Sequence, residues 1–187
     1  MDIPAMLGSA VAEFDARVRQ IGDGQWQAAT PDDDWAVRDL VSHLVSEDLW
    51  APPLLAGSTI AEVGDRFEGD VLGTDPKAAW SAASTRAVRA AEADGALDRT
   101  VHLSFGDVPG RDYALQLFAD HLIHAWDLAR AIGAEERLDP GLVESCAAWF
   151  EAMEDAYRGA GAIAARPPVP SGADAQTRLL AQFGRRA

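Results

Sequence analysis

The segment DYALQLFADHLIHAWDLARAI (residues 112–132) is the most helix-like part of this chain, and it contains the sequence DHLIH (residues 120–124). Two of the four histidines in 187 residues lie in that short stretch. An α-helix places side chains four residues apart on one face, with roughly 5–6 Å between their Cβ atoms. The carboxylate of Asp120 and the imidazole of His124 can therefore share one metal ion. We expect the fold to be built around this helix.

A third ligand would have to come from another part of the chain, and His43 is the best candidate. Apolar residues recur at helical spacing through residues 36–50, which predicts an amphipathic helix there. His43 lies on the flank of its apolar stripe, and Glu47 follows one turn later. Two imidazoles and one carboxylate suit Zn²⁺, Fe²⁺ or Ni²⁺. Three protein ligands leave a position open for water or a substrate, as in catalytic metal sites.

The pattern alone leaves other interpretations open. An Asp-x₃-His pair on a helix also occurs as a simple ion pair, and a single histidine such as His43 can be a residue at the edge of the core. His121 lies about 60° from His124 around the helix axis, which makes those two the weaker chelating pair. Glu47 could orient a ligand or remain solvated. Asp127 could support the site or pair with Arg130.

The rest of the chain predicts further helices and one extended segment. Asp-Pro pairs at residues 75–76 and 139–140 are typical helix starts, Gly133 is a typical helix end, and Pro52-Pro53 should stop the second helix. The acidic run at residues 32–34 should mark the start of that second helix. Residues 100–105 alternate as an exposed strand does, and we expect a short extended excursion or a small hairpin there. The expected helices cover residues 7–21, 36–50, 75–93, 112–132, 139–158 and 174–183, with a short helical piece at 59–63.

These elements predict an all-α fold, a four-helix bundle with long connections that is not a simple meander. We expect residues 1–160 to form the bundle. Residues 161–187 should form an extended linker and a short C-terminal helix that packs on the bundle. A single Cys146 in an apolar helical run is expected to be buried, and a chain without a possible internal disulfide fits a reducing cytosol.

Charge and hydropathy exclude several classes of partner. The formal net charge is −14, which disfavours binding to nucleic acid or to anionic membranes. No apolar run approaches the roughly 18 residues of a membrane span, and the N-terminus lacks the basic region of a signal peptide. We therefore expect a cytoplasmic protein whose partners are small molecules.

Two motifs resemble a known family. Residues 35–44 (WAVRDLVSHL) and 120–133 (DHLIHAWDLARAIG) are similar to the two signatures of the mycothiol-dependent maleylpyruvate isomerase metal-binding domain, within the DinB-like superfamily. The chain resembles most an actinobacterial subfamily of uncharacterised metal-binding proteins. Its ending, with PPVP at 167–170 and RLLAQFGR at 178–185, fits that subfamily too.

This resemblance implies an up-down-down-up four-helix bundle that holds one divalent metal. The implied ligands are His43 on the second helix and the pair Asp120 and His124 on the later helix. Asp120 stands where the isomerase has a glutamate, so its carboxylate is one methylene shorter. The resemblance favours metal binding over a simple polar pair, with zinc expected and nickel or iron as alternatives.

The resemblance also implies a type of reaction. We expect metal-dependent transfer or isomerisation that joins a low-molecular-weight thiol, such as mycothiol, to an electrophile. The isomerase has a further C-terminal domain where this chain has a tail, so we do not expect maleylpyruvate isomerisation itself. The alternatives are a non-catalytic metal or small-molecule binding module and a bundle without metal. Relatives with this fold often pair, which implies a homodimer as one oligomeric state.

Overall fold

The computed structural model describes residues 2–32 and 34–187, and within them the fold is all-α apart from one hairpin, as predicted. None of the described helices is long and apolar enough to cross a membrane. The elements in chain order are α1 (Ile3–Val18), α2 (Val37–Leu55), α3 (Ile60–Val63), α4 (Pro76–Glu92), β1 (Thr100–Leu103), β2 (Gly106–Pro109), α5 (Gly110–Ile132), α6 (Pro140–Phe150), α7 (Glu154–Gly159) and α8 (Ala175–Gln182).

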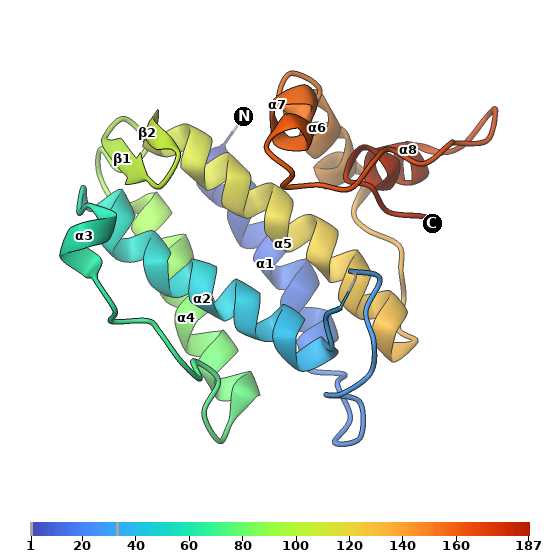
Figure 1. The fold of residues 1–187 in the computed structure, drawn as a ribbon, viewed down its shortest axis with the longest axis horizontal. Helices are drawn as coiled ribbons and strands as arrows, with labels where there is room; N and C mark the ends of the chain where they lie inside the picture. Colours follow the sequence, from blue (N-terminus) through green and yellow to red (C-terminus); the bar gives the residue numbers. More distant parts are fainter. Residues whose placement is uncertain (1, 33) are drawn as a thin grey trace.

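Four helices form the bundle. Helix α1 packs against α4 and α5, and α2 also packs against α4 and α5, so that α1 and α2 occupy opposite corners. Figure 1 shows that α1 and α5 run in one direction and α2 and α4 in the other. This is the up-down-down-up topology that the resemblance implies, and it confirms the prediction of a bundle that is not a meander.

Aromatic and aliphatic side chains fill the bundle. Phe14 and Trp80 join α1 to α4, with their ring centroids 4.7 Å apart, and both are almost completely buried. Trp126 and Phe118 supply the largest buried side chains of α5. Full burial of each such side chain contributes about 1.5–3 kcal/mol to stability. This core fixes the relative position of α2 and α5, which carry the candidate metal ligands.

Local capping signals predict several helix ends correctly. The carboxylates of Asp75 and Asp139 accept hydrogen bonds from the first backbone N–H groups of α4 and α6, at 3.0 Å from Ala78 and 2.8 Å from Gly141. Gly133 ends α5 with φ of 72°, a left-handed conformation that costs a glycine little. Helix α1 begins earlier than expected, at Ile3, because Asp2 caps it.

The prediction that Pro52 and Pro53 stop the second helix is wrong, because α2 continues to Leu55. The prolines lie in its last turn, where they lack N–H donors but still offer their carbonyl oxygens to Ala56 and Ser58 at 3.0 and 2.9 Å. A proline inside a helix costs about 3 kcal/mol. Burial of Leu54 and Leu55, each worth about 1.5–3 kcal/mol, offsets that cost.

The helix expected over residues 139–158 is divided in two. Helix α6 ends at Phe150, a turn follows, and α7 begins at Glu154. No glycine or proline lies in residues 151–153, so the sequence gives no signal for this break. The turn brings Trp149 and Tyr157 together, with ring centroids 6.4 Å apart.

The extended segment is a small hairpin, one of the two forms that were predicted. Strands β1 and β2 pair antiparallel, with Leu103 opposite Gly106 at the turn. Figure 1 shows the hairpin and α3 at the same end of the bundle, near the end of α2 and the start of α5.

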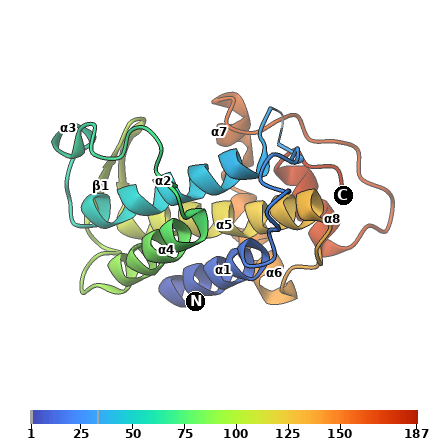
Figure 2. The same ribbon diagram turned by 90° about the horizontal axis from the view of Figure 1, so that it is seen from below.

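The C-terminal elements lie together on one side of the bundle. Helices α6, α7 and α8 gather beside α5 in both views (Figures 1 and 2). Phe183, just after α8, stacks on Phe150 of α6 with a centroid distance of 3.9 Å, and Leu179 and Leu180 are fully buried. The C-terminal helix thus packs on α6, and the division of the chain at residue 160 remains a prediction.

Candidate metal centre

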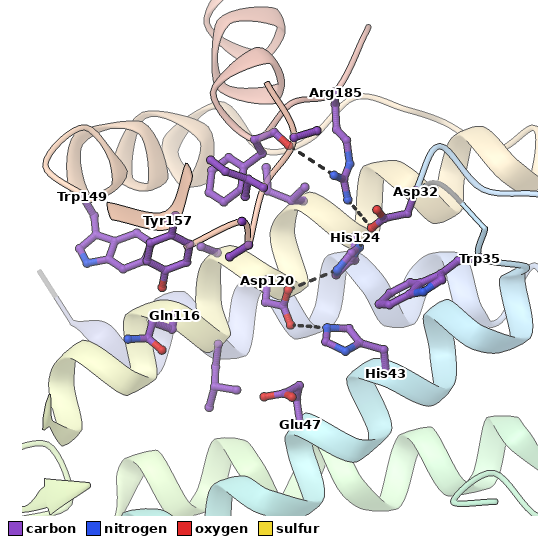
Figure 3. A pocket seen from close by; sticks show the side chains of 18 of the residues that line it. Asp32, Trp35, His43, Glu47, Gln116, Asp120, His124, Trp149, Tyr157 and Arg185 are labelled. Atoms are coloured by element: carbon purple, nitrogen blue, oxygen red, sulfur yellow. Dashed lines mark hydrogen bonds and ion pairs between the residues drawn. The ribbon is translucent and has the colours of Figure 1, made fainter. Parts of the chain in front are cut away.

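His43, Asp120 and His124 come together between α2 and α5. One ligand atom from each lies within 4.8 Å of the other two. The Asp120 carboxylate lies between the rings, with Oδ2 3.0 Å from Nε2 of His43 and Oδ1 3.3 Å from Nε2 of His124. Figure 3 shows both imidazoles directed at this carboxylate. Asp120 and His124 converge because they are four residues apart on α5. His43 joins them because it lies on the flank of the apolar stripe of α2, as the sequence indicated.

Exposure differs among the three side chains. The side chains of His43 and Asp120 are 29% and 31% exposed, whereas that of His124 is 7% exposed. Trp35 covers both imidazoles, with ring centroids 5.0 Å from His43 and 5.9 Å from His124. The cluster therefore has one side closed by an aromatic ring and one side open.

The three groups shift one another's pKa values. Burial alone would lower the pKa of each histidine and raise that of Asp120. The Asp120 carboxylate outweighs burial at both rings, so the pKa of His43 is raised and that of His124 rises to about 10. The two imidazoles in turn hold the pKa of Asp120 well below its ordinary range. Without a metal, the proton that His124 retains up to about pH 10 compensates the charge of the Asp120 carboxylate.

Two charged side chains, Asp127 and Arg185, form a hydrogen-bonded series that ends at Nδ1 of His124. Nδ1 lies 2.9 Å from Oδ2 of Asp127, which is fully buried. Arg185, from the C-terminal tail, donates hydrogen bonds to both Asp127 oxygens, with Nε 3.0 Å from Oδ1 and Nη2 2.9 Å from Oδ2. Arg130, the expected alternative partner of Asp127, instead pairs with Glu136. Asp127 is therefore placed to orient His124, one of the two roles considered for it, and that role stays a prediction.

Asp32 extends this network. Asp32, His124 and Asp127 form a second group with ligand atoms within 4.8 Å, but Nη2 of Arg185 lies 2.5 Å from the Asp32 carboxylate. The positive charge of the Arg185 guanidinium thus compensates the negative charges of Asp32 and Asp127.

The acidic run lies just before α2, as a start signal would, but Asp32 does not cap the helix. Helix α2 begins at Val37, and Asp39 within it accepts the hydrogen bond from the Ala36 N–H at 2.9 Å. Asp32 precedes that helix by too many residues to reach its first N–H groups. Asp33 lies outside the described residues.

His121 and Glu47 occupy different surroundings from the three central residues. His121 is completely buried, with Nε2 3.2 Å from Asp48 and Nδ1 2.7 Å from the Leu117 carbonyl oxygen. It faces the bundle core. Glu47 lies one turn from His43 at the wall of the pocket, and burial together with the Asp120 charge raises its pKa.

A pocket of about 700 Å³ opens onto the cluster. Sequence reasoning did not identify its far wall, which Trp149, Tyr157 and Phe183 form together with residues 161–164. Trp126 of α5 is buried in the core and does not line this pocket. Cys146 is buried as expected, and burial raises the pKa of its thiol to about 12, so it is not a ready nucleophile.

A four-helix bundle with two histidines and a carboxylate converging from two helices beside a pocket defines a class of candidate metal-binding bundle proteins. The chain belongs to the family of the mycothiol maleylpyruvate isomerase N-terminal domain, which matches residues 7–129. The resemblance found in the two sequence motifs is thereby confirmed. The match includes His43, Asp120, His124 and Asp127 and ends before the tail that supplies Arg185.

Two curated proteins are also similar to this chain. They are uncharacterised proteins from two strains of Mycobacterium tuberculosis, each 32% identical over 178 residues, a span of 92% of this chain and 91% of theirs. No solved structure matches the chain significantly.

Proposed function

We propose that this protein binds one divalent metal ion, preferably Zn²⁺, through His43, Asp120 and His124. We further propose that it catalyses the transfer of a low-molecular-weight thiol, such as mycothiol, to an electrophile. The single observation that carries the proposal is the convergence of three ligand atoms within 4.8 Å at the wall of a pocket of about 700 Å³. A pocket of this size suits a small-molecule substrate.

The donor set fits such an ion. Ligand bonds of 2.0–2.2 Å at tetrahedral angles place neighbouring ligand atoms roughly 3.3 Å apart. Oδ2 of Asp120 lies 3.0 Å from His43 and Oδ1 lies 3.3 Å from His124. One ligand atom from each residue lies within 4.8 Å of the other two, so the side chains would have to close by at most roughly 1.5 Å. The hydrogen bond between Asp127 and Nδ1 of His124 is the support that metal-binding histidines usually have.

A metal held there would act as a Lewis acid and lower the pKa of a thiol in the pocket. The protein's own side chains would orient the ligand, exclude water and confine the reactants. Asp127 and Arg185 keep Nε2 of His124 facing Asp120, while Trp35 excludes water from the closed side of the two rings. Trp149 and Tyr157 would confine the thiol and the electrophile to the open side.

The experiment combines metal analysis with an assay of thiol transfer. Purified protein should contain stoichiometric metal and should accelerate conjugation of mycothiol to monochlorobimane. His43→Ala should lose both properties. His102→Ala is the matched control for metal content, because His102 also pairs with an aspartate, Asp107 at 2.7 Å, but does not line the pocket.

The outcomes separate the alternatives. Stoichiometric metal without turnover above the His43→Ala control would indicate a non-catalytic binding module. Protein that contains no metal, even after incubation with Zn²⁺, would overturn the metal site and leave a structural bundle.

A further inference from the structure

A second, smaller groove joins the candidate metal pocket. It has a volume of about 270 Å³ and lies between the end of α2, α3 and the hairpin. Glu47, Tyr113 and Gln116 line both hollows, so the two meet at these side chains. Figure 3 shows Glu47 on α2 and Gln116 on α5 facing the space beside Asp120. The remaining walls of the groove are Trp50, Leu54, Ile60, Leu103, Ser104 and Phe105.

The groove contains two unusually exposed apolar side chains. Among the described residues, only Ile60, Phe105 and Met153 are large hydrophobic residues that are exposed, at 38%, 71% and 37%. Two of these three line the groove. Ile60 and Phe105 come from separate elements, α3 and the hairpin turn. Exposed apolar groups that converge on a concave surface indicate a binding site, whereas scattered ones do not.

Ordered elements hold these side chains in place. Thr59 and Glu62 cap α3 reciprocally, with N–H to carboxylate and N–H to hydroxyl distances of 2.8 and 3.2 Å. The paired strands β1 and β2 fix the turn that carries Phe105. Trp50 at the back of the groove packs edge-on against Phe67, with centroids 5.8 Å apart.

A polar group without a partner lies at the junction of the two hollows. Among the described residues, nothing forms a hydrogen bond with the buried hydroxyl of Tyr113, although buried hydroxyls normally have a partner. Burial and the nearby charge of Glu47 raise the pKa of this hydroxyl, so it stays protonated and can donate. A ligand that passes the junction could accept that hydrogen bond.

We propose that this groove binds the aromatic or other apolar part of the electrophilic substrate, while the electrophilic carbon lies in the metal pocket. The inference rests on the proposed thiol transfer and adds the substrate class: a ring joined to a hydrogen-bond acceptor that meets Tyr113. Drug-sized ligands occupy pockets of roughly 300–1,000 Å³, so a groove of this volume accepts one or two rings rather than a whole cofactor. The larger pocket is left for the thiol.

Kinetics with two electrophiles test the groove. The selectivity for bicyclic monochlorobimane over small iodoacetamide, measured as a ratio of kcat/KM values with mycothiol, should fall roughly three- to tenfold in Phe105→Ala, as expected for one lost aromatic contact. Met153→Ala is the matched control, because it also removes an exposed apolar side chain but lies outside the groove. An unchanged ratio in Phe105→Ala would overturn the proposal.

Binding of a non-reactive probe keeps the inference testable even if thiol transfer fails. The ¹⁹F resonance of 4-fluorobenzyl alcohol should broaden with wild-type protein and with Met153→Ala, and broaden much less with Phe105→Ala or Tyr113→Phe. Tyr113→Phe removes only an unpartnered hydroxyl, so its thermal stability should not fall. Equal broadening by wild-type protein and Phe105→Ala would refute the groove. Equal broadening by wild-type protein and Tyr113→Phe would refute the role of the hydroxyl.

Discussion

Helix α5 carries two histidines less than one turn apart that lie in opposite surroundings. His121 faces the bundle core and meets Asp48, and both side chains are completely buried. His124 faces α2 and the pocket and meets Asp120, which is 31% exposed. Each is an imidazole beside a carboxylate, so residue type alone does not distinguish the two pairs. The two pairs differ in which other groups lie near the carboxylate.

Among the described residues, the closed pair is part of no group of three ligand atoms, and both of its side chains are completely buried. Its two groups face each other within the core, where Oδ2 of Asp48 contacts His121 and Oδ1 has no hydrogen-bond partner among the described residues. The carboxylate of the open pair meets a second imidazole, that of His43, and borders a pocket of about 700 Å³. A pair of this kind becomes a candidate site when it has a further ligand and an approach for a small molecule. The closed pair should therefore govern stability, and the open pair should govern metal binding.

Removal of Asp48 is expected to have the largest effect. Asp48→Ala leaves the buried His121 without its counter-charge, which costs about 3–5 kcal/mol of unfolding free energy. Denaturant unfolding followed by circular dichroism measures this loss. His102→Ala, which breaks an exposed pair, should change stability by less than about 1 kcal/mol. Equal losses in the two variants would show that the closed pair has no special role.

Removal of His124 tests the other half of the comparison. His124→Ala should weaken Zn²⁺ binding by at least about a hundredfold, because a direct ligand matters more than a supporting group, whose loss typically costs 10–100-fold. Competition with a chromophoric chelator gives the affinity. His121→Gln should bind Zn²⁺ nearly as well as wild-type protein. Stoichiometric metal that persists in His124→Ala would contradict the assignment of His124 as a ligand.

Arg185 should have a smaller effect on the same affinity. Arg185→Met removes the guanidinium that holds Asp127 and Asp32, so His124 loses its fixed orientation and the two carboxylates repel each other. We expect Zn²⁺ affinity to fall by roughly tenfold. Arg166→Met is the control, since Arg166 forms an exposed pair with Glu154 at 3.4 Å. Affinity that remains at the wild-type value in Arg185→Met would show that the tail does not support the site.

The contrast between near and distant partners explains what the sequence could predict. The Asp120–His124 pair and the 60° offset of His121 follow from helix geometry alone, and the Asp-Pro and glycine signals are equally local. The Arg185 contacts join residues 58 and 153 positions apart, so no local pattern contains them. The extension of α2 through Pro52 and Pro53 likewise depends on burial of the leucines that follow, which only the packed bundle decides.

The pH dependence of metal binding also tests the open pair, because the expected change in affinity is spread over several pH units. The pKa of His124 rises to about 10 in the metal-free protein, above its ordinary value of about 6.5. Its proton therefore stabilises the metal-free fold fully below pH 6.5, and that contribution disappears as the pH rises through about 10. Zn²⁺ must displace this proton, so affinity should increase by up to about tenfold per pH unit between pH 6.5 and 9. Calorimetry in buffers of different ionisation enthalpy counts the protons released, and a release of none would contradict coordination by His124.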